Sequence, residues 1–365
     1  MTVKNSKINT SQLCVILIGI FLASRPILEN SMQAEIVGND SIITSIIAGL
    51  INLMLALLIC YVIYKNPGES FYDIIKRILG KNITKVIMLL LSIVFFIKLL
   101  IIDYQMSDLL YDAIYSDINW NFFVIPVFLL FAYIAIKGIK TIGRCFQFFL
   151  PFAIFILVAT LLISVSSANI NNALPLFNHT VPQFFEAIKY LLIQSCEFIF
   201  LFTFMENVVA KKHYFTKVSL SLGLVFVLVI GFYILFILVL GNIAPFVQET
   251  LIKLTQFSNV GEGYFKIDIF TATMWIPIVA LECCLCVYGI SYSLKKAFNI
   301  NEVITSLTTI TLLFITKFIP QINTFSIFSF FYDTVGIYVL LFVLMLPILL
   351  VIASFKKEGK NDKQN

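Results

Sequence analysis

Long apolar runs separated by short polar segments dominate this chain. A helix needs about 20 mostly apolar residues to cross a bilayer. Because each run is continuously apolar rather than alternating, the pattern favours helices over β-strands. The pattern therefore predicts an all-α polytopic membrane protein with about ten transmembrane helices, at roughly residues 11–29, 41–64, 85–106, 121–138, 145–166, 185–206, 217–241, 268–291, 303–319 and 332–354.

Two of the loops between these spans carry a helical pattern of their own. In residues 65–84, apolar side chains recur at helical spacing from Phe71 to Leu79, which predicts a short interfacial helix that stops at Gly80. In residues 241–267, a similar pattern predicts a segment that either lies across one face of the bundle as a cap or gate, or is a plain interfacial linker.

Composition and charge support the membrane assignment. The chain is 60% hydrophobic and 12% charged, whereas soluble domains are about a quarter charged. If the N-terminus is cytoplasmic, most of the 25 Lys and Arg residues fall in the cytoplasmic segments, as the positive-inside rule requires. We expect both termini on the cytoplasmic side. The net charge of +5 is spread over short loops, and no basic stripe indicates nucleic-acid binding.

The seven cysteines and two histidines do not predict a disulfide framework or a metal site. The number of cysteines is odd, and most of them lie inside apolar runs, where Cys is a small packing residue. The cluster Cys283, Cys284 and Cys286 makes metal binding conceivable, but packing is the favoured interpretation. The sequence also contains no Gly-rich phosphate loop and no Ser-His-Asp set, so we expect neither an enzyme nor a cofactor.

Spans 1 and 6 each carry a polar interruption. Span 1 is interrupted at Ala23-Ser24-Arg25-Pro26, where proline removes a backbone donor, and span 6 at Gln194-Ser195-Cys196-Glu197. These spans start on opposite sides of the membrane, so a 5+5 division gives an inverted repeat. Paired interruptions of this kind indicate a transporter-type site at the bilayer midplane, although a proline kink and a separate polar cluster would give the same pattern.

Charged residues inside the spans are the candidates for function, because they are costly in a bilayer and usually face a cavity. Lys98 and Glu197 lie at similar depth, so they are expected to pair, either as a structural ion pair or as a proton or substrate switch. The candidate charged residues are Arg25, Lys98, Asp103, Glu197 and Glu282.

Several short motifs, taken in order, resemble one family. The first motif is Ile8-Asn9-Thr10-Ser11-Gln12-Leu13, and the second span opens at Asn39-Asp40-Ser41-Ile42-Ile43. The following loop carries Leu79-Gly80-Lys81, span 6 carries Cys196-Glu197, and span 8 carries Phe265-Lys266-Ile267-Asp268 and then Trp275. Over residues 8–355 this order resembles the B subunit of spore germinant receptors, the endospore germination permeases. The Trp of the second motif is absent here, and Cys replaces Gly beside Glu197.

The resemblance implies an amino-acid/polyamine/organocation superfamily fold with a LeuT-like core of two inverted repeats and interrupted helices 1 and 6. Its ligand pocket would map to Gly19, Ser24, Leu100, Asp103, Cys196, Glu197, Cys284 and Tyr288. It also implies residence in the spore inner membrane and assembly with A-type and C-type receptor subunits. The expected ligand is a small germinant, typically an amino acid.

We expect one permease-like domain over residues 1–355, with repeats at about 8–166 and 183–354, followed by a charged cytoplasmic tail at 356–365. The leading hypothesis is a germinant-sensing receptor subunit that triggers germination. An amino-acid transporter coupled to H⁺ or Na⁺ would have the same fold, and a scaffold without a ligand is a third alternative.

Overall fold

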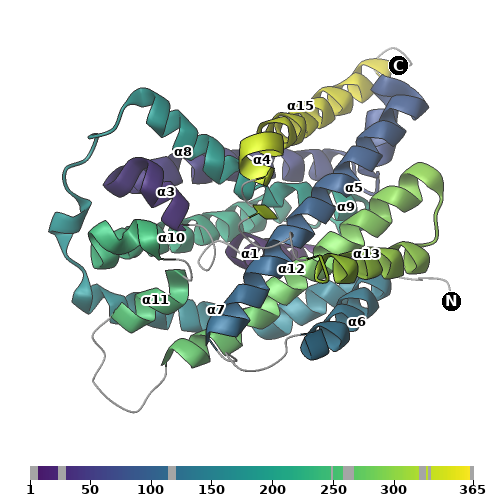
Figure 1. The fold of residues 1–365 in the computed structure, drawn as a ribbon. Coiled ribbons are helices and arrows are strands. Elements are labelled where there is room, and N and C mark those ends of the chain that lie inside the picture. The colour runs from purple at the N-terminus through teal and green to yellow at the C-terminus, as the bar shows by residue number, and fades with distance from the viewer. Residues whose placement is uncertain are drawn as a thin grey trace.

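The protein is a bundle of helices, and within the part of the chain that the structure describes, strands form at two short segments (Figure 1). The computed structural model describes residues 7–23, 30–113, 121–247, 250–257, 267–319, 326–327 and 330–361. Its α-helices are α1 (Thr10–Ala23), α3 (Asn30–Val37), α4 (Ser41–Lys65), α5 (Phe71–Ala113), α6 (Asn121–Lys137), α7 (Ile139–Ser164), α8 (Val181–Gln194), α9 (Leu201–Phe204), α10 (Tyr214–Leu240), α11 (Thr250–Phe257), α12 (Ile267–Phe298), α13 (Glu302–Thr316) and α15 (Gly336–Asn361).

Short irregular helices connect these elements. The 3-10 helices are η1 (Gly38–Asp40), η2 (Val165–Ser167), η3 (Ile170–Ala173), η4 (Glu197–Phe200), η5 (Met205–Asn207) and η6 (Gly241–Phe246), and η7 (Phe330–Val335) is a π-helix. The strands are β1 (Ile8–Asn9) and β2 (Val208–Val209).

The helices confirm the prediction of about ten spans. Seven described segments are long and apolar enough to cross a membrane, and three shorter apolar helices accompany them. Each falls on one of the ten predicted spans. The long segments are Ser31–Lys65, Phe71–Asp108, Ile139–Ser167, Val181–Asn207, Tyr214–Phe246, Thr273–Phe298 and Gly336–Phe355, and the short helices are Thr10–Ala23, Ile125–Lys137 and Glu302–Thr316.

Helix 6 is broken where its sequence predicts. The half-helix α8 ends at Gln194, and the chain resumes as η4 and α9 after two non-helical residues, Ser195 and Cys196. Helix 1 consists of α1 and the shorter α3, and the predicted interruption at Ser24–Pro26 lies outside the described residues. The half-helices α3 and α8 pack side by side (Figure 1), so the two broken helices meet.

A two-residue parallel strand pair joins the same two helices at the opposite end. Ile8 pairs with Val208 and Asn9 with Val209. Asn9 also begins α1 with a reciprocal cap: its side-chain oxygen accepts from the Gln12 N–H at 2.8 Å, and the Gln12 side chain accepts from the Asn9 N–H at 3.4 Å. Such a cap satisfies backbone donors that the first turn of a helix leaves unpaired.

Both predicted loop helices are present. The interfacial helix forms the first part of α5, and the helical geometry breaks at Gly80, whose φ is 76° and ψ is 174°. It is anchored on helix 6, because Phe71 packs on Phe202 with ring centroids 4.5 Å apart. In the second loop, α11 packs against α7, α10 and α12 and buries Leu251 and Leu254.

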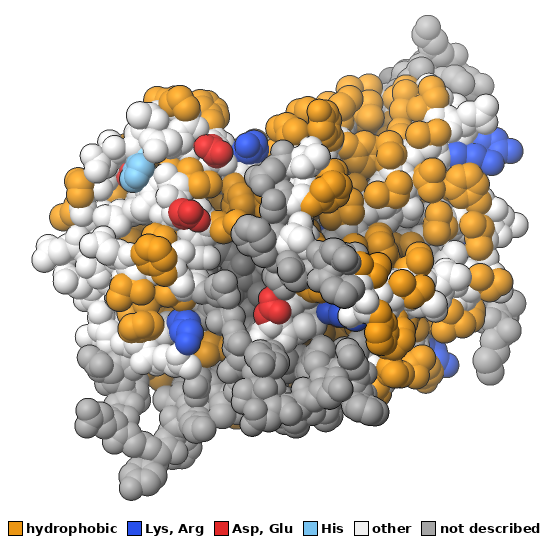
Figure 2. Space-filling view, viewed as in Figure 1, with side chains coloured by type: hydrophobic (Ala, Val, Ile, Leu, Met, Phe, Trp, Pro, Cys, Tyr) orange, Lys and Arg blue, Asp and Glu red, His pale blue; other side chains and the backbone are white. Residues whose placement is uncertain are grey.

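The surface of the bundle is mostly hydrophobic, as a bilayer environment requires. Figure 2 shows hydrophobic side chains over much of the face formed by α13 and α15, with few charged groups among them. On α15, side chains more than half exposed recur at helical spacing, namely Leu341, Met345, Ile348 and Ile352. In the core, α12 packs most extensively against α5, which forms one wall of the candidate site.

Candidate functional site

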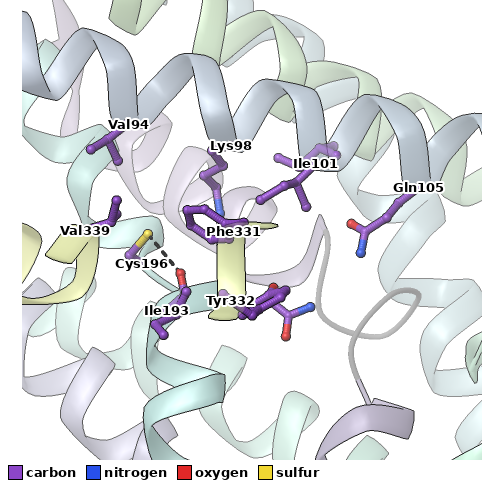
Figure 3. Close-up of a pocket in the computed structure, with 11 residues that line it drawn as sticks. Val94, Lys98, Ile101, Gln105, Ile193, Cys196, Phe331, Tyr332 and Val339 are labelled. Carbon is purple, nitrogen blue, oxygen red and sulfur yellow. Dashed lines mark hydrogen bonds between the residues drawn. The ribbon is translucent and has the colours of Figure 1, made fainter. Parts of the chain in front are cut away.

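A small cavity opens beside the break in helix 6 (Figure 3). The space between its walls, including its open mouth, is about 400 Å³. One wall is a single face of α5, because its lining residues follow one another at spacings of three, four or one: Val94, Lys98, Ile101, Ile102 and Gln105. The end of α8 and the break form a second wall with Ile193, Gln194 and Cys196, and Phe331, Tyr332 and Val339 of η7 and α15 close the third.

Side-chain hydrogen bonds accompany the last helical hydrogen bond at the break, from the Ser195 N–H to the Leu191 carbonyl at 2.8 Å. The Ser195 hydroxyl donates to the Leu191 carbonyl at 2.5 Å, and the Asn52 side-chain amide of α4 donates to that hydroxyl at 2.9 Å. Serine side chains that bond to the backbone offer it an alternative to helix geometry. Because a helix end leaves its last carbonyls without intrahelical partners, the end of α8 presents polar backbone groups beside the cavity.

A buried charge cluster lies in the cavity wall. The Lys98 ammonium is 3.3 Å from a carboxylate oxygen of Glu282 on α12 and 3.7 Å from one of Glu197 on η4. All three side chains are buried, so their charges interact strongly and hold α5, α12 and helix 6 together. The structure thus brings together Lys98, Glu197 and Glu282 of the predicted charge network, and Arg25 lies outside the described residues.

Asp103 belongs to a separate ion pair at the end of α5. Its carboxylate is 2.7 Å from the ammonium of Lys317, which follows α13. Lys317 also donates to the Ser107 hydroxyl at 2.9 Å and lies 3.8 Å from the ring centroid of Tyr104. This arrangement ties the end of α13 to α5 and does not line the cavity.

Four further residues predicted for the pocket do not line this cavity: Gly19, Leu100, Cys284 and Tyr288. Gly19 allows α1 to approach α7, because a Cβ there would lie 2.3 Å from the Phe146 ring. Tyr288 stacks on Tyr292 along α12, Cys284 is buried, and Leu100 packs on the core. Ser24 lies outside the described residues. Of the predicted pocket, Cys196 is at the cavity wall, and Glu197 is adjacent to it.

The pocket predicted from the sequence omits two glutamines of the cavity, Gln105 and Gln194, although Gln194 belongs to the predicted interruption of span 6. Gln105 lies seven residues after Lys98, on the same face of α5, and that spacing is the signal that could have found it. Gln194 is 7% exposed, and neither polar atom of its amide has a hydrogen-bond partner among the described residues. An amide buried without a partner is costly.

The comparison with known families agrees with this architecture. Residues 7–326 match the sequence model of the spore germination protein family. The chain belongs to that family. It is similar to the spore germination protein YndE of Bacillus subtilis (strain 168), with 23% identity over 97% of this chain and 98% of the relative.

The fold of this spore germination protein is that of a LeuT-type transporter. It superimposes on the crystal structure of MhsT in complex with L-phenylalanine with a TM-score of 0.61, covering 94% of this chain and 97% of MhsT at 13% identity. The predicted fold class is therefore confirmed, and the chain is a germination-related permease of the membrane. Membership of this family points to a membrane protein rather than an enzyme.

The family motifs lie where the broken helices are anchored. The first motif supplies β1 and the cap of α1, and Trp275 donates to the carbonyl of Ala23, the last residue of α1, at 2.7 Å. Gly80 breaks α5, and Cys196 and Glu197 stand at the break of helix 6. Phe265 and Lys266 lie outside the described residues.

Proposed function

We propose that this spore germination protein is the membrane subunit of a germinant receptor, and that it binds a small nutrient, an amino acid, at the break of helix 6. The observation that supports this proposal is the cavity beside that break. Lys98 and Cys196 lie in its wall, and the carboxylates of Glu197 and Glu282 lie behind it, near the Lys98 ammonium. Released backbone groups and buried side chains suit a zwitterionic ligand.

Binding would act by favouring one arrangement of the two repeats, residues 8–166 and 183–354, over another. A ligand shifts such an equilibrium only through its different affinity for the two arrangements. A-type and C-type receptor subunits would detect the change. The protein would lie in the spore inner membrane, with both termini and the charged tail at 356–365 on the cytoplasmic side.

A working transporter coupled to H⁺ or Na⁺ is the second candidate. The feature that favours it is the buried pair of carboxylates at the broken helix, since ionisable groups inside a bilayer mark ion or proton pathways. Uptake of a labelled amino acid into proteoliposomes would distinguish a transporter from a receptor that binds without transport.

The first test is amino-acid-triggered germination of spores that carry Glu197→Gln. Glu186→Gln is the matched control, because Glu186 is exposed on α8, in the other half of the same helix. With subunit abundance equal by immunoblot, we expect Glu197→Gln to shift the concentration dependence at least tenfold and the control to leave it unchanged. Equal dose–response curves for the two variants would contradict the site.

A further inference from the structure

Two polar amide side chains lie among the apolar side chains of the cavity wall. Gln105 stands apart from Val94, Cys196 and Val339 in Figure 3, with Lys98 between them along α5. Gln194, at the end of α8, and Gln105 are the two primary amides of the wall. A primary amide donates two hydrogen bonds and accepts two, so this pair suits a ligand group that offers both donors and acceptors.

Gln194 shows that this polar part is adapted to a ligand rather than to packing. Its side chain is 7% exposed, lines the cavity, and has no hydrogen-bond partner for either polar atom among the described residues. A hydrophobic residue of similar size would be less costly at a position that served packing alone. A ligand with an ammonium and a carboxylate would satisfy both atoms of the amide.

Apart from Lys98 and Cys196, the remaining wall is aliphatic and aromatic. Val94, Phe331 and Val339 face the same space, and the Lys98 ammonium is already within 3.3 Å of Glu282 and 3.7 Å of Glu197. These apolar side chains offer no partner to a charged or amide side chain of a ligand, and burying such a group without a partner is unfavourable. They would contact a hydrocarbon side chain closely.

We propose that the cavity selects a neutral amino acid with a branched aliphatic side chain. Gln105 and Gln194 are the residues that bind its ammonium and carboxylate, and Val94, Phe331 and Val339 contact its side chain. This inference rests on the proposed function and names the class of nutrient that the site accepts.

The test uses the full chain, purified in lipid nanodiscs and unfolded by heat with L-valine, L-leucine, L-isoleucine, L-glutamate, L-lysine or L-asparagine. A ligand that binds only the folded protein raises the unfolding temperature. We expect the three aliphatic amino acids to raise it and the other three to leave it unchanged.

Gln194→Leu separates a ligand-binding role from a structural one. We expect this variant to unfold without ligand at the same or a higher temperature, because it removes an unpartnered buried amide, and to need at least tenfold more L-valine for half of the effect. Gln147→Leu is the control, since Gln147 is exposed on α7. Val339→Ala shortens a side chain of the apolar wall and so enlarges the space beside it. We expect this variant to shift the preference from valine towards leucine and isoleucine.

Two sets of results would overturn this inference while the proposed function stood: stabilisation by the polar or charged amino acids instead of the aliphatic ones, or an unchanged valine requirement in Gln194→Leu. A parallel panel of sugars and nucleosides tests the proposed function itself. If no amino acid, sugar or nucleoside changes the unfolding temperature, the nutrient-binding function fails, and the inference fails with it.

Discussion

Asp40 shows at the scale of one residue how the chain positions a loop around its broken helices. This fully buried carboxylate accepts from the backbone N–H groups of Phe177, Asn178 and His179 at 2.6, 3.0 and 3.3 Å, and from the His179 ring at 2.9 Å. It therefore fixes the loop that precedes α8 onto the start of α4. In the sequence, the motif around Asp40 is one of those that resemble the family. In the structure, Asp40 holds the loop before α8 in place.

Lys98 is the residue whose loss should be most costly. Its ammonium lies between two buried carboxylates, and removing one partner of a buried ion pair typically costs about 3–5 kcal/mol. We expect Lys98→Met to lower the free energy of unfolding by about that amount. Lys81→Met, at an exposed position of the same helix, should change it by less than about 0.5 kcal/mol. Thermal unfolding in detergent measures both, and equal unfolding temperatures would exclude a stabilising charge cluster.

At the scale of elements, two breaks shape the molecule for different reasons. Helix 6 breaks after Gln194, where the Ser195 hydroxyl adds a second hydrogen bond to the Leu191 carbonyl and accepts one from the Asn52 amide. The long helix α5 breaks at Gly80, where the backbone takes a conformation that is essentially confined to glycine. The first break lies beside the candidate cavity, whereas the second turns the interfacial helix against helix 6.

Two glycines make a matched pair that tests the second break. A Cβ at Gly80 or at Gly223 would meet no atom within 4 Å, so only the backbone distinguishes them. We expect Gly80→Ala to lower the free energy of unfolding by about 1–3 kcal/mol, because alanine does not tolerate a φ of 76°. Gly223→Ala, inside the regular helix α10, should raise it by about 0.5–1 kcal/mol. Chemical denaturation of both variants checks the opposite signs.

The elements also show how far the sequence alone predicts this fold. Runs of apolar residues are long enough to reveal all ten spans, and the polar residues from Gln194 to Glu197 reveal the break in helix 6. The short helix α3 lies beyond the predicted first span, and the pairing of β1 with β2 was not predicted, because the partners of β1 lie about 200 residues away.

The candidate site was predicted in part for a related reason. Lys98 and Glu197 stand out because charge is rare in a span. By contrast, Val339 and Phe331 are apolar residues in an apolar run. Their positions in the sequence do not show whether they line a cavity or contact lipid. Asp103 pairs with Lys317 because two helices that are distant in the sequence pack together. The position of Asp103 in the sequence therefore gave no sign that this residue lies outside the cavity.

At the scale of the whole molecule, the exposed hydrophobic surface defines the region that lipid covers. Met345 is 56% exposed near the middle of the last span, whereas Phe355 is 50% exposed at its end. A Lys at the centre of a transmembrane helix costs about 2.5–3.5 kcal/mol on insertion scales, and one near the end extends its ammonium to the interface. We expect Met345→Lys to reduce the amount of protein in the membrane fraction several-fold and Phe355→Lys to leave it nearly unchanged. Equal amounts on immunoblots would contradict this placement of α15 in the bilayer.

The strand pair between β1 and β2 has a consequence for motion. It joins the start of α1 to the end of helix 6 through two residues on each side, so neither broken helix can swing outward at that end until the pair separates. A backbone hydrogen bond contributes about 0.5–1.5 kcal/mol net, so this ladder is a weak latch. Because the pair is weak, separating the two strands costs little free energy. A ligand that binds the separated form more tightly by a few kcal/mol would then make that form the major one. Under the proposed function, such a pair would let a small binding energy change the arrangement of helices 1 and 6.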